Sequence, residues 1–279
     1  MPAKRYLSEK FDVDRLVHVL DEIPIWSAPF GLKLLDCVDY KPRITALDVG
    51  FGMGFPLTEL AMRLGPSSVV YGIDPWKPAI ERTQLKLQSY AIDNVRIIEG
   101  VAEDIPLEND TLDLIVSNNG INNVQDLGRV LSECARVLRS GGQFVLTMNL
   151  DKTMFEFYGQ LEEVLSELGL EKEIVDMRRH IYEKRRPLDE IIALLKEHGF
   201  LIKNLEHDQF NYKFTDGTAM LHHFVVRMAF MDSWIKLLPE GRVEEIFDMV
   251  ETRLNEQAER LGGLQLSVPF VVINLSKEN

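Results

Sequence analysis

Short apolar runs alternate with segments of helical spacing along the first half of the chain. The apolar runs predict five strands, at residues 44–48, 68–74, 94–98, 112–117 and 143–148. The segments between them predict helices at 57–64, 77–90 and 124–138, and Ser140-Gly141-Gly142 is typical of a helix stop. Strands that alternate with helices predict an α/β fold, with a parallel sheet and right-handed crossovers.

The pattern continues on both sides of this region. Beyond residue 150, helical spacing predicts helices at 151–170, 187–198, 217–238 and 240–261, with a charged stretch between the first two. Extended segments are expected at 201–205 and 266–275, and Pro269 favours an edge position or a bulge for the last strand. Before the sheet, residues 11–40 predict two helical pieces separated by Pro24. Tyr6 and Trp26 could line a pocket there, or the segment could simply pack on the sheet.

Charge and cysteine content narrow the function. The net charge of −13, from 31 basic and 44 acidic residues, argues against a nucleic-acid partner, because phosphates are held mainly by Lys and Arg. Two local basic runs, at 178–180 and 184–186, leave open a small acceptor that carries phosphate or carboxylate. Cys37 and Cys134 have neither pairing nor metal-ligand spacing, which fits a reducing compartment. With no apolar signal core and no stretch of membrane-spanning length, we expect a cytoplasmic protein that does not bind membranes.

The most informative stretch is the turn after the first strand. The apolar run ends at Asp48, and glycines follow at alternate positions, Gly50, Gly52 and Gly54. Glycine permits positive φ and lets a ligand approach the backbone, while Pro56 suits the first turn of a helix. Such a loop presents N–H groups and a helix N-terminus to a ligand at the carboxyl end of the strand. A glycine-rich turn without a ligand is the alternative interpretation.

A second carboxylate strengthens the hypothesis of a ligand site. Asp74 closes the second predicted strand, where a carboxylate can accept hydrogen bonds from both hydroxyls of a ribose. It could also cap the helix that follows. The dinucleotide fingerprint would place its third glycine at Phe55, but here that glycine is Gly54.

The D-x-G-x-G-x-G arrangement from Asp48 to Gly54 resembles motif I of the class I S-adenosylmethionine (SAM)-dependent methyltransferases. The resemblance covers residues 44–150 and implies a Rossmann-like fold: a mostly parallel seven-stranded sheet with helices on both faces, plus a helical cap. It implies three parts, namely an N-terminal helical segment (1–43), a SAM-binding core (44–150) and a C-terminal part (151–279). The C-terminal part would complete the sheet and carry an acceptor-binding cap at about 151–186 and 215–263.

The resemblance also implies which residues bind SAM. Many relatives have an Asp after the glycine that ends the third strand, to bind the adenine amino group, but this chain has Val101 there. Glu103, Asp104 or the backbone of Ala102 could replace it. The full set expected at the cofactor is Asp48, Gly50, Phe51, Gly52, Gly54, Asp74, Pro75, Trp76, Ala102, Glu103, Asn118 and Asn119.

The function implied by the family is transfer of the SAM methyl group to a small organic acceptor by in-line displacement, leaving S-adenosylhomocysteine. A proton acceptor could come from His180, His222 or His223, with Tyr182 as an orienting phenol, although each histidine could equally be structural. No metal-ligand spacing occurs, so no metal site is expected. The aromatic and methionine side chains of 210–234 suit an apolar acceptor pocket or an ordinary helix core.

Two other functions remain open at this point. One is an NAD(P)-dependent oxidoreductase, which shares the sheet and the ribose carboxylate. The other is a SAM-binding protein without methyltransferase activity. The chain is expected to be a monomer or a homodimer.

Overall fold

The computed structural model describes residues 5–8, 12, 17 and 26–278. Of the two helical pieces expected before the sheet, most of the first lies outside the described residues. The second is α3 (Ser27–Asp36), which buries Phe30, Leu34 and Leu35. The expected helical piece is therefore present from residue 27.

The described part of the chain contains one seven-stranded sheet. In chain order its strands are β1 (Thr45–Val49), β2 (Val69–Asp74), β3 (Val95–Glu99), β4 (Leu112–Asn118), β5 (Leu138–Asn149), β6 (Phe200–Phe214) and β7 (Leu264–Lys277). They are arranged β3-β2-β1-β4-β5-β7-β6. The first five pair in parallel, whereas β7 runs antiparallel to β5. This topology confirms the predicted Rossmann-like, mostly parallel sheet.

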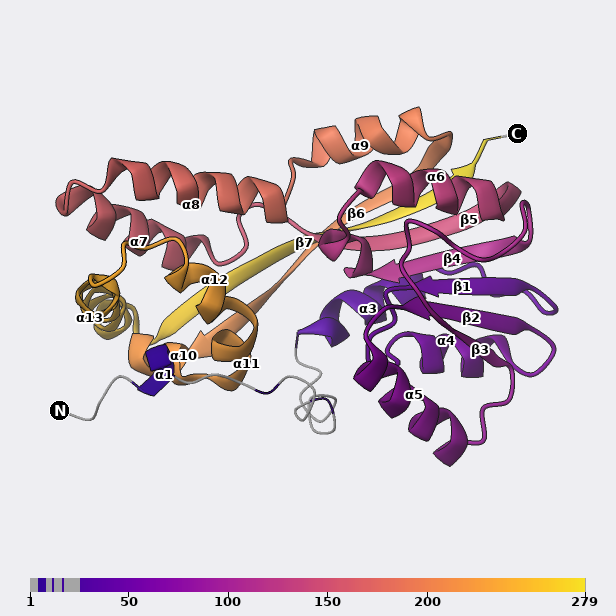
Figure 1. The fold of residues 1–279 in the computed structure, drawn as a ribbon, viewed down its shortest axis with the longest axis horizontal. Helices are drawn as coiled ribbons and strands as arrows, with labels where there is room; N and C mark the ends of the chain where they lie inside the picture. Colours follow the sequence, from indigo (N-terminus) through magenta and orange to yellow (C-terminus); the bar gives the residue numbers. More distant parts are fainter. Residues whose placement is uncertain (1–4, 9–11, 13–16, 18–25, 279) are drawn as a thin grey trace. The chain divides into compact units, whose positions relative to one another are not determined.

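Helices cover both faces of the parallel strands. They are α4 (Leu57–Leu64), α5 (Lys77–Ser89), α6 (Leu127–Val137) and α9 (Leu188–Glu197). Figure 1 shows α4 and α5 on one side of the sheet and α6 and α9 on the other. In α6 the buried residues recur at helical spacing, and Asp126 caps its start by accepting the Arg129 N–H at 2.9 Å. Because both faces are covered, the inner strands are apolar along almost their whole length.

The chain divides into two compact units. One comprises residues 13–149, 187–208 and 270–279 and holds the parallel strands; the other comprises 1–12, 150–186 and 209–269. The helical elements of this second unit are α1 (Arg5–Ser8), α7 (Phe155–Glu167), α8 (Glu171–Lys184), α10 (Gly217–His222), α11 (Phe224–Val226), the π turn η2 (Arg227–Met231), α12 (Asp232–Ile235) and α13 (Val243–Leu261). Both predicted cap segments, 151–186 and 215–263, fall in this unit. Their role over the acceptor stays a prediction.

Several element predictions were wrong in instructive ways. The charged stretch after residue 170 is the helix α8, which buries only Ile174 and Met177, so its apolar signal was too weak to read. The single helix expected at 217–238 is interrupted at His223, whose ψ of 131° is extended. Residues 140–142 belong to β5, which begins directly after α6 instead of after a glycine stop. The strand expected at 201–205 continues to Phe214.

Pro269 does not mark an edge strand. β7 lies between β5 and β6, so the edge is β6. The register between β5 and β7 ends at the pair Asn149 and Phe270, and Pro269 contributes its carbonyl, which accepts the Leu150 N–H at 2.9 Å. Proline is tolerated because no ladder hydrogen bond from its nitrogen is required there.

Two glycines allow the ends of β1 and β4 to come close together. Gly50 follows β1, and Gly120 begins the 3₁₀ turn η1 (Gly120–Asn123) after β4. A Cβ added to Gly120 would lie 2.2 Å from the Val49 carbonyl oxygen, and one added to Gly50 would lie 2.8 Å from the Gly120 Cα. The close approach of the two turns therefore excludes side chains at both positions.

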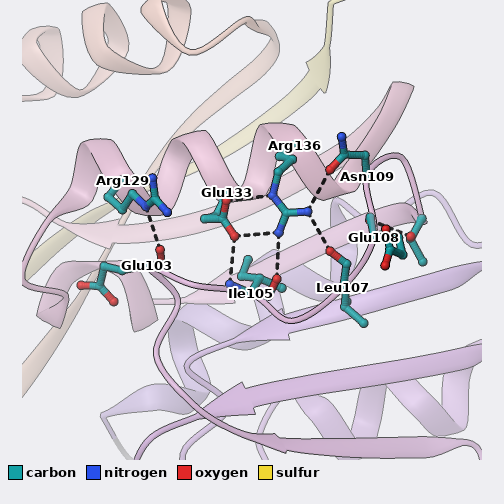
Figure 2. Close-up of polar contacts among 9 residues, drawn as sticks. Glu103, Ile105, Leu107, Glu108, Asn109, Arg129, Glu133 and Arg136 are labelled. Atoms are coloured by element: carbon teal, nitrogen blue, oxygen red, sulfur yellow. Dashed lines mark hydrogen bonds and ion pairs between the residues drawn. The ribbon is translucent and has the colours of Figure 1, made fainter.

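The loop after β3 is held on α6 by one ion pair, in which Glu133 is buried and Arg136 half-buried. Arg136 donates to both carboxylate oxygens of Glu133, and to the carbonyls of Ile105 and Leu107 at 2.8 and 2.7 Å (Figure 2). Glu133 also accepts the Ile105 N–H at 2.9 Å. Its hydrogen bonds with Arg136 hold the pKa of Glu133 below its usual range. One planar guanidinium thus fixes the course of a loop that has no regular secondary structure.

None of the helices in the described part of the chain is both long enough and apolar enough to span a membrane.

Replacing Gly120 by Ala is expected to lower the free energy of unfolding by about 1–3 kcal/mol, because the added methyl group must displace the Val49 carbonyl. Chemical denaturation measures the effect. Gly159→Ala is the matched control, since a Cβ there meets nothing within 4 Å inside α7, and it should stabilise by about 0.5–1 kcal/mol. Equal stability of Gly120→Ala and the wild type would contradict the close approach.

Replacing Glu133 by Gln is expected to cost about 1–3 kcal/mol at neutral pH, because Arg136 loses its charged partner. The pKa of Glu133 is lowered in the folded state, so its stabilisation is present above the unfolded pKa and is lost as pH falls through the folded pKa. The difference between variant and wild type should therefore shrink below about pH 4 in urea denaturation series. Glu81→Gln, at an exposed position, is the control. A difference in free energy of unfolding between Glu133→Gln and the wild type that stays constant down to acid pH would contradict the prediction.

Candidate functional site

The turn after β1 has the backbone conformation that its glycines predict. Gly50, Gly52 and Gly54 have φ values of 77°, 51° and 99°, all in the region that disfavours side chains. The turn leads into α4, where the N–H groups of Thr58 and Leu60 bond the carbonyls of Gly54 and Pro56. A Cβ at Gly52 would meet nothing within 4 Å, so the backbone there borders open space that a ligand can enter.

Helix α5 holds this turn in place. The Thr83 hydroxyl donates to the Gly52 carbonyl at 3.2 Å, and Lys86 Nζ donates to the Met53 carbonyl at 2.9 Å. Sequence reasoning missed both residues, because nothing in their local pattern distinguishes them from other polar positions on α5. The N–H groups of the glycines are bonded within the protein as well: Gly50 donates to the Ile73 carbonyl, Gly54 to the Phe51 carbonyl and Gly52 to Asp74 Oδ2.

Asp48 is the most unusual residue of the site. It is fully buried at the end of β1, and neither carboxylate oxygen has a well-formed hydrogen bond. Burial, and secondly repulsion from Asp74, raise the pKa of Asp48 well above its usual range, while the Leu57 N–H opposes them only in part. A buried carboxylate in this state would be stabilised by a bound cation.

Asp74 combines the two roles that the sequence left open. Its Oδ2 accepts the Gly52 N–H at 2.8 Å, which ties the glycine turn to the end of β2. Its Oδ1 accepts the Trp76 N–H at 2.9 Å at the start of α5. Each carboxylate oxygen has a further lone pair, so Asp74 can still receive hydroxyl groups. Next to it, Pro75 is exposed and Trp76 is half-buried.

The loop after β3 has no carboxylate at position 101, where many relatives have an Asp for the adenine, so the contact is left to the backbone or to neighbouring residues. Ala102 is buried, whereas Val101 is 47% exposed. The side chain of Glu103 accepts the N–H groups of Gln125 and Asp126 at 2.9 and 3.3 Å, ahead of α6. The Glu103 carbonyl accepts Arg129 Nε at 3.0 Å (Figure 2). The structure therefore assigns Glu103 a contact with the start of α6, in addition to its predicted place near adenine.

The asparagines after β4 form a polar cluster with the end of β5. Asn118 donates to the Ser27 carbonyl of α3 at 3.1 Å and accepts the Thr147 hydroxyl at 3.0 Å. Asn119, with φ of 58°, accepts from the Asn149 N–H at 3.1 Å and from Asn122 Nδ2 at 2.9 Å. Asn119 Nδ2 and Asn122 Oδ1 are buried without a hydrogen-bond partner. Thr147 and Asn122 were not predicted, and a lone threonine in an apolar strand was the only signal for the first.

The predicted proton acceptors lie in the other unit, on two different helical stretches. His180 and Tyr182 are on α8, and Tyr182 is 47% exposed. His180 borders a surface hollow of about 370 Å³, and burial followed by the nearby Arg185 lowers the pKa of His180. His180 is thus held in its neutral form near neutral pH.

His222 and His223 have separate surroundings. His222 ends α10, with Nδ1 at 2.9 Å from the Thr218 carbonyl and its ring against Tyr6. The ring of His223 packs near Phe214 at 5.3 Å, and its Nδ1 is buried without a partner. Burial lowers the pKa of His223. Of the two, only His223 has a buried nitrogen left to bind a ligand.

The charge at the glycine turn suits SAM better than a dinucleotide. Asp48 and Asp74 place two carboxylates close enough to repel each other, beside a turn that is open at Gly52. A pyrophosphate would add further negative charge, whereas SAM brings a sulfonium and an ammonium group. The buried oxygens of Asp48 that lack good hydrogen bonds therefore fit the cationic end of SAM, and the free lone pairs of Asp74 fit its ribose.

Comparison with known proteins agrees with this interpretation. Residues 47–146 match the family model described as a methyltransferase domain. Demethylmenaquinone methyltransferase of Bacillus mycoides is 29% identical over 151 residues, which cover 54% of this chain and 62% of that relative. The match thus spans about three fifths of the relative's length.

Solved structures share the fold. A SAM-dependent methyltransferase from Aquifex aeolicus has a TM-score of 0.53 at 20% identity, over 70% of this chain and 92% of that one. Geranyl diphosphate C-methyltransferase from Streptomyces coelicolor, solved with Mg²⁺, geranyl diphosphate and S-adenosylhomocysteine, has a TM-score of 0.55 at 17% identity. That match covers 96% of this chain and 85% of the other. At such identities these likenesses show the fold alone.

The domain match, the glycine turn and the strand order agree with one another. Residues 47–146 are similar to a methyltransferase domain, and the strand order is the one that the resemblance to the class I SAM-dependent methyltransferases implies.

Proposed function

We propose that this chain transfers the methyl group of SAM to a small organic acceptor and releases S-adenosylhomocysteine. The observation that carries the proposal is the pair of carboxylates, Asp48 and Asp74, beside the open backbone of Gly52. SAM, when bound, supplies an electrophilic methyl group on a positively charged sulfur.

In this proposal each residue of the turn has a distinct task. Asp48 neutralises the cationic amino-acid end of the cofactor, and Asp74 accepts the ribose hydroxyls while it keeps Gly52 in place. Many relatives have an acidic residue where this chain has Val101. The backbone of Ala102 takes over its contact with the adenine in this proposal. Asn119 offers its buried Nδ2 as a donor near the end of β4. These contacts orient the methyl group, and orientation is the main contribution that a protein makes to a displacement reaction.

The acceptor is proposed to bind to the helical unit, at residues 151–186 and 215–263. The names of two relatives give acceptors that are small molecules with an apolar body, demethylmenaquinone and geranyl diphosphate. The match to the first relative covers little more than half of this chain, so it supports a small-molecule acceptor as a class. Where the acceptor must lose a proton, His180 and His223 are the proposed bases, because burial favours the neutral form of both.

Asp74→Asn is expected to weaken SAM binding by about tenfold or more, because the amide offers one acceptor fewer and donates where Gly52 or the ribose also donates. Isothermal titration calorimetry with SAM, S-adenosylhomocysteine, NADH and NADPH gives the comparison. Glu81→Gln on α5 is the control, since it removes one exposed carboxylate outside the site and should bind SAM like the wild type. Tight nicotinamide binding by the wild type without SAM binding would instead favour the oxidoreductase.

Asp48→Asn is expected to have different effects on the stability of the fold and on the binding of SAM. The folded-state pKa of Asp48 is raised, so ionisation destabilises the fold as pH rises above the unfolded value of about 3.9. The variant should therefore be at least as stable as the wild type at neutral pH while binding SAM more weakly. Denaturation and calorimetry on the same preparations measure both.

The raised pKa of Asp48 also leads us to expect that SAM binding releases a proton. The cation should favour the ionised carboxylate, so up to about one proton leaves per SAM bound at pH values where free Asp48 is protonated. Calorimetry in two buffers of different ionisation enthalpy counts the protons. Release should vanish in Asp48→Asn, and unchanged release in that variant would show that another group titrates.

A further inference from the structure

The helical unit contains a buried arginine without a counter-ion. Arg185 follows the last turn of α8 and is only 6% exposed. Its Nε and Nη1 are buried and have no hydrogen-bond partner. Nε carries one hydrogen and Nη1 two, so three donor positions lack an acceptor. Among the residues that the structure describes, no carboxylate forms an ion pair with Arg185.

The surroundings of Arg185 compensate this charge only in part. Its guanidinium lies over the Tyr158 ring, 6.0 Å from the centroid. A cation–π contact contributes far less than the desolvation of a guanidinium costs. The Tyr158 hydroxyl accepts the Trp234 indole N–H at 3.0 Å, and neither Nε nor Nη1 of Arg185 is bonded to it.

The side chains beside Tyr158 are aromatic, and the residues that directly flank Arg185 in the chain are basic, with the exposed Glu183 one position further. Trp234 is fully buried and stacks on Phe157 with ring centroids 3.8 Å apart, which makes the wall beside Tyr158 rigid and apolar. On either side along the chain, Lys184 and Arg186 are exposed and add positive charge. An apolar environment strengthens the attraction between a guanidinium and any anion that reaches it.

We propose that Arg185 binds an oxyanion, a carboxylate or a phosphate, carried by the acceptor, so that the acceptor is an acidic small molecule. Three unmet N–H donors in a positively charged, apolar setting match the several acceptor oxygens of such a group. That the anion belongs to the acceptor rests on the proposed function, whereas the anion site itself does not.

The test compares rigid apolar probes that share a naphthalene ring and carry either an anionic or a neutral group. Naphthoate, naphthyl phosphate and the neutral naphthamide are titrated into the full chain by calorimetry at constant ionic strength. The wild type should bind one of the two anions about ten- to hundredfold more tightly than the amide, as expected for hydrogen bonds to a charged group. Which anion binds better distinguishes a carboxylate from a phosphate acceptor.

Arg185→Met should abolish the preference for the anion, and Arg185→Lys should reduce it because an ammonium has fewer donors in fixed directions. Arg186→Met is the matched control: it removes the adjacent exposed charge and should keep the preference. The melting temperature of Arg185→Met should be unchanged or higher, since a buried charge without a partner is removed. A lower melting temperature would show that the folded protein already stabilises this charge, and would overturn the proposal.

Binding of SAM is measured on every variant and should not change. A wild type that binds SAM but shows no preference for the anions overturns the anion site and leaves the proposed function standing. A wild type that prefers the anions but does not bind SAM overturns the proposed function and leaves the anion site standing. Retention of the preference in Arg185→Met also overturns the assignment to Arg185.

Discussion

The full burial of one carboxylate, Asp48, beside a second one, Asp74, is the constraint on which the cofactor half of this protein depends. Asp48 and Asp74 end adjacent parallel strands, so the topology itself brings them to the same edge of the sheet. Asp74 is stabilised by the N–H groups of Gly52 and Trp76, whereas Asp48 is fully buried and has no comparable donors. Ionisation of Asp48 is therefore unfavourable in the fold, and a bound cation would favour it. The positive φ values of the glycines and the contact of Lys86 with the Met53 carbonyl fix the turn beside this carboxylate.

Much of this half could be predicted from the sequence because its signals are local. The glycines from Gly50 to Gly54 and the carboxylate of Asp74 are each read from a few neighbouring residues, and β1 to β4 lie within one or two residues of their predicted positions. What holds the site together is not local. Arg136 reaches Ile105, and Thr147 reaches Asn118, across about 30 residues in each case. Such contacts depend on which strands are neighbours, and no periodicity in the chain records them.

The helical half was harder to predict for physical reasons that differ from element to element. α8 buries only two side chains, so its sequence lacks the apolar periodicity that predicts a helix. The stretch from residue 217 is divided into shorter helices by the extended backbone of His223. The aromatic and methionine residues of 210–234 were expected either in an acceptor pocket or in a core, and the structure supports the core for two of them. Trp234 and Met220 are fully buried, and Trp234 stacks on Phe157, so these two belong to a core. The isolation of Arg185 could not be foreseen, since the basic run at 184–186 looks like an ordinary solvated surface.

Asp48 and Arg185 have the same unfavourable environment but ionise with opposite signs. Each is a buried ionisable group without an adequate partner within the protein, and each lowers the stability of the fold compared with a neutral side chain. A charge that is already desolvated and fixed in place gains more from a ligand of the opposite sign than a solvated surface charge does, because less water and less side-chain motion are lost on binding. SAM brings positive charge to Asp48, and an acidic acceptor would bring negative charge to Arg185. On this argument the two buried groups lie at the two places where ligands are proposed to bind, one in each compact unit, and binding of each proposed ligand would recover the cost of burying the group.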